Sequence, residues 1–239
     1  MIDIKTLLDP VILSSFSFLI FFLILLYFTA KKMKNMKFFF TAAVILLAWF
    51  LVVSILGMTD FFSKNPLFAP WLLISFLILF QLLRMAYNSQ IVKTAAENVS
   101  QPWITAIQIY RVVGVGFIFL YFQGVLPAWF AFPAGIGDMI VGITAPFVAV
   151  LYYLKKPYSR KLAIWWNIIG IADLVIAIAT GMTGFPRPIQ FVPVTPSTEP
   201  ISLFPLMIIP LFAVPLAFLL HFCSLRVLRE KKLYHLVSW

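Results

Sequence analysis

The sequence is poor in charge, in acidic residues and in cysteine. Only 11% of its 239 residues are charged, with 8 Asp and Glu against 18 Lys and Arg, whereas 63% are hydrophobic. Because soluble domains carry about 25% charged residues, this composition excludes a water-soluble globule and a disordered chain. The one cysteine, Cys223, excludes an internal disulfide and a thiolate metal cluster. Two histidines without an H-x-x-x-H spacing give no reason to expect a metal site or another cofactor.

Long apolar runs are what the sequence has in abundance. A bilayer core about 30 Å thick is crossed by about 20 helical residues, so the sequence predicts one all-α domain, 1–239, with seven transmembrane helices. The predicted spans are 11–30, 38–58, 67–87, 103–122, 131–153, 162–183 and 203–224. Pro205, Pro210 and Pro215 predict that the last span is kinked or locally unwound. The proline-rich connection 184–202 fits a lid over the outer mouth of the bundle and a passive strap equally well.

Basic residues are distributed unevenly between the two sides of these spans. Of the 18 Lys and Arg, 14 flank one side, three flank the other, and Arg111 lies within a span. Because Lys- and Arg-rich loops stay in the cytoplasm, we expect the amino terminus outside and the carboxyl terminus in the cytoplasm. The protein is then a multi-pass protein of the plasma membrane or the bacterial inner membrane. Basic collars at helix ends indicate the lipid bilayer as a partner and argue against nucleic-acid binding.

Three charged residues lie inside predicted spans, namely Arg111, Asp138 and Asp173. A charge at the bilayer centre costs at least about 2.5–3.5 kcal/mol, so we expect the three to converge, with the guanidinium engaging both carboxylates. Such a cluster is either an ion pair that positions helices or a substrate, ion or proton site. In the second case we expect one carboxyl group to exchange a proton near neutral pH.

The two aspartates lie in matching segments of neighbouring spans. GIGDMIVGITA occupies 135–145, and GIADLVIAIAT occupies 170–180. Small residues allow helices to approach closely in membranes. Because the two spans run in opposite directions, the match predicts a pseudo-two-fold axis in the membrane plane, which is typical of transporters. The alternative is that the small residues serve packing alone.

Further polar residues extend the candidate site. Gln108 shares a helical face with Arg111, and Asn167 and His221 are predicted to form a second layer with Gln81 on the cytoplasmic side. His221 is either a proton relay or an interfacial group near a helix end. The residues predicted to bind substrate or ion are Arg111, Asp138, Asp173, Gln108, Tyr110 and Asn167.

Three functions remain open at this point. Seven spans with an outward amino terminus resemble retinal proteins, but no predicted span contains a lysine for a Schiff base. The same count and orientation resemble SWEET-type sugar transporters, in architecture alone. We favour a transporter or proton-linked carrier of a small substrate that uses the Arg/Asp/Asp cluster.

The alternatives are an intramembrane enzyme and a structural membrane subunit, and an oligomer is open in each case. In the enzyme, Asp138 or Asp173 would be a catalytic general acid toward a lipid or isoprenoid substrate. A water path to Asp173 from alternate sides would indicate transport. A dry pocket open to lipid would indicate the enzyme, and the absence of a cavity would indicate the structural subunit.

Overall fold

The computed structural model is helical and free of strands over the residues it describes, which are 4–64, 77, 80–81, 89–186 and 191–237. Within them, five helices are long and apolar enough to cross a membrane: Met36–Met58, Gln101–Phe122, Ala128–Tyr153, Ser159–Thr183 and Ile209–Arg229. These helices are those of a helical membrane protein. Most of the predicted span 67–87 lies outside the described residues, so the count of seven stays a prediction.

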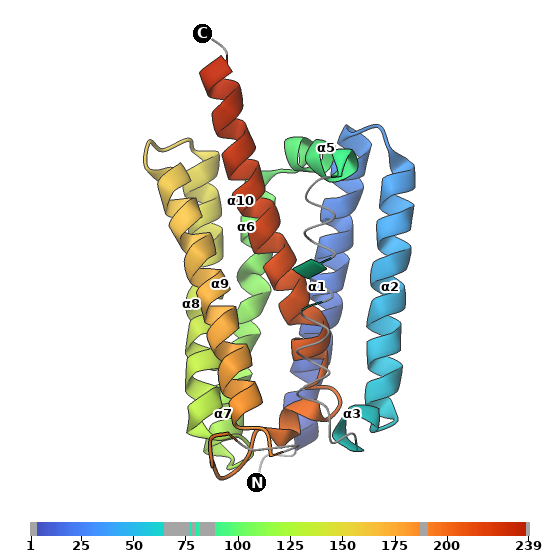
Figure 1. Cartoon of the computed structure of the whole chain (residues 1–239), viewed down its shortest axis with the longest axis vertical. Coiled ribbons are helices and arrows are strands. Elements are labelled where there is room, and N and C mark those ends of the chain that lie inside the picture. Colours follow the sequence, from blue (N-terminus) through green and yellow to red (C-terminus); the bar gives the residue numbers. More distant parts are fainter. Residues whose placement is uncertain (1–3, 65–76, 78–79, 82–88, 187–190, 238–239) are drawn as a thin grey trace.

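The helices form two groups with the last helix between them. In chain order they are α1 (Ile4–Lys32), α2 (Met36–Met58), α3 (Phe61–Lys64), α5 (Gln90–Asn98), α6 (Gln101–Ala106), η1 (Ile107–Gly114), α7 (Val115–Phe122), α8 (Ala128–Tyr153), α9 (Ser159–Thr183), η2 (Glu199–Ser202), η3 (Ile209–Ala213) and α10 (Val214–Val237). Helix α8 packs against α9 and against the α6–η1–α7 segment, whereas α1 packs against α2. Helix α10 crosses between the two groups and contacts α9 and α6 (Figure 1).

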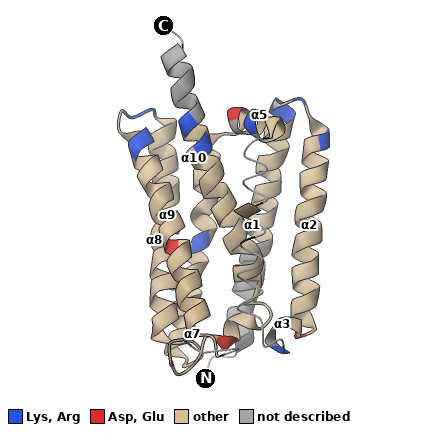
Figure 2. Ribbon diagram, viewed as in Figure 1, with Lys and Arg blue, Asp and Glu red and all other residues tan. Residues whose placement is uncertain are grey.

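Charge separates the two ends of the bundle. Figure 2 shows most of the described Lys and Arg at the end that carries α5, the α1–α2 turn and the α8–α9 turn. We call it the basic end. The opposite end, called the far end, carries α3, the α7–α8 turn and the described part of the connection 184–202 (Figure 1). This polarity agrees with the uneven loops of the sequence, and which end faces the cytoplasm stays a prediction.

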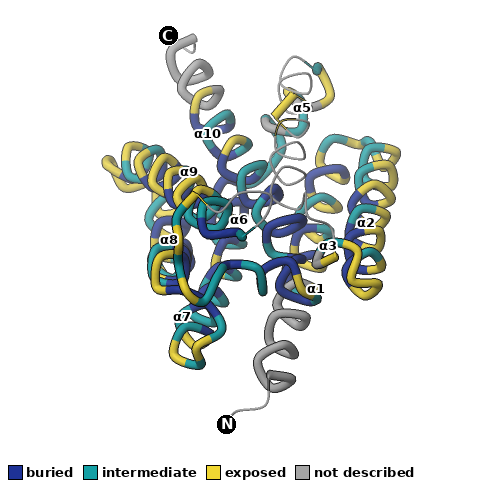
Figure 3. The backbone as a smooth tube through the Cα atoms, turned by 60° about the horizontal axis from the view of Figure 1, so that its bottom comes forward, coloured by how far each residue is buried: buried dark blue, intermediate teal, exposed yellow. Residues whose placement is uncertain are grey.

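The exterior of the bundle is apolar, and several polar and charged side chains are buried together with the hydrophobic core. Large apolar side chains such as Phe122 and Phe147 are 75% and 65% exposed, whereas Arg111 is 3% and His221 is 0% exposed. Figure 3 shows exposed backbone along the outward sides of α2, α8 and α9 and buried backbone between the helices. An apolar exterior is stable in lipid, where the buried polar groups must find partners inside the protein.

Two helices depart from regular α-geometry next to the cluster of charges. Residues Gln101–Phe122 are helical throughout, but the middle segment η1 is a 3-10 helix. The predicted span 203–224 begins too early, because residues 204–207 form turns and the helix starts with the π-helical turn η3 at Ile209. Pro205 and Pro210 lack the N–H that a regular helix would need there. The predicted local unwinding is therefore present, and the helix extends further toward the carboxyl terminus than expected.

Candidate functional site

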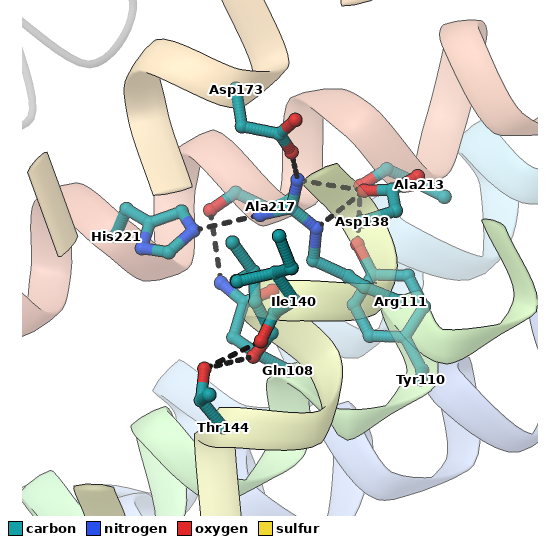
Figure 4. A network of polar contacts seen from close by, with 11 residues as sticks. Gln108, Tyr110, Arg111, Asp138, Ile140, Thr144, Asp173, Ala213, Ala217 and His221 are labelled. Atoms are coloured by element: carbon teal, nitrogen blue, oxygen red, sulfur yellow. Dashed lines mark hydrogen bonds and ion pairs between the residues drawn. The ribbon is translucent and has the colours of Figure 1, made fainter. Parts of the chain in front are cut away.

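The guanidinium of Arg111 joins three helices at the centre of the site. Its Nε donates to Oδ1 of Asp138 at 2.7 Å, and its Nη2 lies 2.7 Å from the same oxygen. Nη2 also donates to Oδ2 of Asp173. Arg111 comes from η1, Asp138 from α8 and Asp173 from α9, and Figure 4 shows the guanidinium between the two carboxylates. The structure therefore brings together the three intramembrane charges that the sequence singled out.

The geometry of η1 explains why Arg111 points inward. A 3-10 helix has three residues per turn, so residues three apart lie in one row along it. The buried residues of η1 are Gln108, Arg111 and Gly114, which form such a row. At Gly114 a Cβ would lie 2.9 Å from Oδ2 of Asp138, so glycine leaves room for the carboxylate.

The small residues of α8 bring its backbone against its neighbours. A Cβ at Gly142 would lie 2.6 Å from the backbone nitrogen of Val112 in η1. A Cβ at Gly137 would overlap the carboxylate of Asp173. Both glycines therefore serve close approach, and both lie within one to four residues of Asp138. The same small residues that permit helix packing thus also make room for the ion cluster.

A chain of hydrogen bonds leads from Arg111 toward the basic end. Nη1 of Arg111 donates to Nε2 of His221 at 3.2 Å, and Nδ1 of His221 lies 2.9 Å from Oδ1 of Asn167. Nδ2 of Asn167 donates to Oγ of Ser224 at 2.8 Å, and Nε2 of Gln101 donates to the same oxygen at 2.6 Å. We call His221, Asn167, Ser224 and Gln101 the polar seam. It connects α10, α9 and α6.

The partners of His221 fix its protonation state in this arrangement. A guanidinium can only donate, so Nε2 of His221 accepts and Nδ1 carries the proton that Asn167 accepts. His221 is therefore neutral here and orients Arg111. Because Arg111 cannot accept a proton, a relay through His221 would first require the guanidinium to move, and the predicted relay stays a prediction.

The predicted second layer is only partly present. The interfacial alternative for His221 is wrong, since the residue is fully buried and bonded to Arg111. Helix α10 continues to Val237, which places His221 well inside a helix. Gln81 is exposed and does not join Asn167. Sequence reasoning missed Ser224, although its position three residues after His221 puts both on one helical face.

Gln108 and Tyr110 lie beside the cluster and bind the backbone of the last helix. Nε2 of Gln108 lies 3.4 Å from the carbonyl of Ala217, and the buried Oε1 of Gln108 has no partner among the described residues. The hydroxyl of Tyr110 donates to the carbonyl of Ala213 at 3.1 Å. Ala213 ends the π-helical turn η3, whose irregular backbone leaves this carbonyl available. These contacts tie η1 to the start of α10.

An apolar cavity reaches Asp138 from the far end of the bundle. Its empty volume, the open mouth included, is about 610 Å³. Among the described residues that line it, Asp138 alone is polar: Phe117, Phe130, Ala134, Asp138, Leu174, Ala177, Ile178, Gly181, Met182, Phe185, Ile201, Ile209, Pro210 and Val214. A second cavity, whose empty volume of about 420 Å³ also includes its opening, is lined by Arg111 and Tyr110 and shares Asp138 with the first. Asp138 therefore lies where the two cavities meet.

The described part of the connection 184–202 is fastened beside the mouth of the larger cavity. The hydroxyl of the buried Thr198 donates to the carbonyl of Gly181 at 2.6 Å, and its backbone N–H donates to Gly184 at 3.2 Å. Phe185 and Ile201 of this connection line the cavity. These bonds join the connection to the end of α9, and both the lid and the strap remain open interpretations.

The cluster carries an excess of negative charge. One guanidinium and two carboxylates sum to a formal charge of −1, and both bonds from Arg111 to Asp138 end on Oδ1. No described residue bonds Oδ2 of Asp138. Within the described ranges no group of three or more His, Cys, Asp or Glu could hold a metal ion. A carboxylate beside an apolar cavity is stabilised by a proton or a cation, because either one neutralises its charge.

Comparison with known proteins identifies a family. Residues 67–229 match the family described as a domain of unknown function (DUF8737), and the chain belongs to this family. The match includes every residue of the ion cluster and of the polar seam. No curated protein and no solved structure matches the chain significantly.

Proposed function

We propose that this member of the family is a seven-helix membrane carrier that couples movement of a small substrate to exchange of a proton. The amino terminus lies outside and the basic end in the cytoplasm. The observation that carries the proposal is that the bundle differs between the far-end side and the basic-end side of Asp138. A cavity reaches Asp138 from the far end, and the polar seam closes the path toward the basic end.

In this proposal Asp138 is the point at which substrate and proton compete. Its unbonded Oδ2 is available, while Oδ1 holds the guanidinium. Neutralising Asp138 weakens its charge-assisted hydrogen bonds to Arg111. The guanidinium then depends on Asp173 and His221, which belong to α9 and α10. Occupancy of one carboxylate is thereby transmitted to α9 and α10, two of the three helices that the polar seam connects.

The polar seam is suited to open and close. Its contacts join amide, hydroxyl and imidazole groups, which can exchange protein partners for water. Replacing such a hydrogen bond by water costs about 0.5–1.5 kcal/mol. A few such bonds can therefore separate at a free-energy cost within the range of ordinary conformational equilibria. Opening there while the far end closes gives access to Asp138 from alternate sides.

Cysteine accessibility tests the proposal. In a Cys223→Ala background we would introduce Ser224→Cys in the polar seam or Ile201→Cys in the cavity wall. Each variant is treated with a membrane-impermeant thiol reagent from one side of sealed vesicles at a time. We expect Ser224→Cys to react from the basic-end side and Ile201→Cys from the far-end side.

The matched control is Leu220→Cys, which lies one turn before Ser224 in the apolar core. It is expected to be unreactive from both sides. A folded Ser224→Cys variant that is as unreactive as the control would refute alternating access.

The enzyme remains a second candidate because the cavity is so strongly apolar. Phe117 and Phe130 form an edge-to-face pair in its wall, with ring centroids 5.0 Å apart. Aromatic rings stabilise a developing cation, and Asp138 in its protonated form would be the general acid. This function predicts that incubation with bilayer lipids or isoprenoids yields a new product by mass spectrometry. It also predicts that the seam stays closed to the thiol reagent.

A further inference from the structure

We propose that the cavity at Asp138 binds an amphiphilic primary ammonium cation, with its apolar body in the cavity and its ammonium group on Oδ2. The inference rests on the proposed carrier function and names the chemical class of its substrate. Three properties of the site lead to it: the sign of its charge, the unavailability of Arg111, and the composition of the cavity wall.

The sign of the charge favours a cation. The cluster has a formal charge of −1, and the carboxylate with an unbonded oxygen is the one that lines the cavity. An uncompensated charge beside apolar walls is unfavourable. An ammonium group compensates it and donates a charge-assisted hydrogen bond to the oxygen, which a quaternary cation cannot do.

Arg111 is not available to an anion. All three of its nitrogens are engaged, with Asp138, Asp173 and His221, and the residue is almost fully buried. A ligand carboxylate in the cavity would therefore meet Asp138 and be repelled by it. The site thus rejects anions of the same shape, although it contains an arginine.

The composition of the wall requires an apolar body on the ligand. Apart from Asp138, the described lining is aliphatic and aromatic. The empty volume of about 610 Å³ includes the open mouth, so the apolar body of the ligand occupies the enclosed part next to Asp138 and extends into the mouth. Phe117 and Phe130 lie in the same wall and add attraction for a cation beside their rings. A small hydrated ion would leave this apolar surface without a partner.

The exchange balances in charge and atoms. A protonated Asp138 releases its proton to solvent as R–NH₃⁺ binds, so the carboxylic acid O–H bond breaks and an ammonium–carboxylate ion pair forms. One proton leaves for each cation that enters the site, and the net charge inside the protein does not change. Carried through alternating access, this exchange is an electroneutral antiport.

Three ligands with one apolar body test the class of substrate: adamantylmethylammonium, adamantylmethanol and adamantanecarboxylate. Competition against the radiolabelled ammonium compound is measured on the purified full-length chain at neutral pH. We expect the ammonium compound to bind about tenfold or more tightly than the alcohol, because the alcohol can also donate a hydrogen bond to Oδ2 but carries no charge to compensate the carboxylate. The carboxylate is expected not to compete.

Two variants separate the head group from the cavity. Asp138→Asn is expected to bring the ammonium compound down to the affinity of the alcohol. At Gly181 a Cβ would lie 3.4 Å from the ring of Phe130, so a leucine side chain there extends into the cavity. We therefore expect Gly181→Leu to abolish binding of all three ligands. Gly116→Leu is the matched control, since nothing lies within 4 Å of a Cβ at Gly116.

The outcomes distinguish this inference from the carrier on which it rests. Equal affinity of the ammonium compound and the alcohol in the wild type overturns the cation site, whatever the accessibility of Ser224→Cys. Selective binding of the ammonium compound upholds the site even where Ser224→Cys stays unreactive and the carrier fails. If Asp138→Asn does not fold, the wild-type preference and the Gly181→Leu and Gly116→Leu pair still decide the question.

Discussion

Replacing Arg111 by methionine tests whether the cluster is one electrostatic unit. Methionine keeps an unbranched apolar chain but removes every donor, so Asp138 and Asp173 lose their common partner and Nε2 of His221 loses its hydrogen bond. Breaking a buried ion pair by removing one partner costs about 3–5 kcal/mol, because the remaining charge stays buried. We therefore expect the free energy of unfolding of Arg111→Met to be about 3–5 kcal/mol lower than that of the wild type.

The triple variant Arg111→Met/Asp138→Asn/Asp173→Asn removes all three charges together. Neutral replacement of a buried ion triad is often close to neutral in stability, so we expect it to recover most of the loss. Reversible unfolding in mixed dodecylmaltoside–SDS micelles, followed by circular dichroism, measures both variants. The reasoning is refuted if Arg111→Met unfolds like the wild type, or if the triple variant is no more stable than the single one.

Two further predictions concern packing and topology. Gly142→Ala is expected to lower the thermal midpoint, because its Cβ would lie 2.6 Å from a backbone nitrogen of η1 that cannot move aside. Nothing lies within 4 Å of a Cβ at Gly116, so Gly116→Ala is expected to raise the free energy of unfolding by about 0.5–1 kcal/mol through its higher helix propensity. An equal loss of stability in Gly142→Ala and Gly116→Ala would contradict the packing argument. In the Cys223→Ala background, Lys156→Cys should react with an impermeant maleimide only from the cytoplasm and Lys64→Cys only from outside. The reverse pattern would invert the predicted orientation.

The helices of the apolar runs were predictable from length and composition. The predicted spans 38–58, 131–153 and 162–183 correspond to α2, α8 and α9, each of which begins two or three residues earlier. For α2 and α9 the added residues include the basic Lys37 and Arg160, so the helix begins in the polar interface before the apolar run. Helix α8 instead begins directly after Pro127, and its added residues are apolar. The last span differs more, since apolar composition does not report the backbone constraint that proline imposes.

That error in the last span explains the error about His221. Measured from the middle of 203–224, His221 is near a helix end, where an interfacial role is ordinary. The helix extends from η3 to Val237, so the same residue lies in its interior and contacts Arg111. The spacing from His221 was the one signal for Ser224, and Gln101 had none, because an uncharged polar residue near the end of a predicted span is unremarkable until the facing helix is known. By contrast, the three charged residues of the cluster could be singled out from the sequence, since the cost of a charge in lipid is independent of fold.

The matching segments around the two aspartates do not lead to matching environments. Gly142 packs against η1, whereas Ala177, its counterpart in the second segment, lines the apolar cavity. Gly135 faces Ile118 of α7, whereas its counterpart Gly170 faces His221 of α10. Equivalent small residues of the two segments therefore face different neighbours, although both segments carry an aspartate that bonds Arg111.

This difference gives a single guanidinium two alternative partners of the same chemical kind. One oxygen of Asp138 contacts both Nε and Nη2 of Arg111, whereas Asp173 accepts a hydrogen bond from Nη2 alone. When a cation or proton occupies Asp138, Asp173 is the partner that keeps its full charge. A two-state element requires two arrangements that are close in free energy and that a ligand distinguishes. One donor shared between a carboxylate that lines the cavity and a carboxylate of α9, the helix that supplies Asn167 to the polar seam, is a candidate for such an element. In the proposed carrier, Arg111, more than either aspartate, is then the residue through which the two sides of the bundle would be coupled.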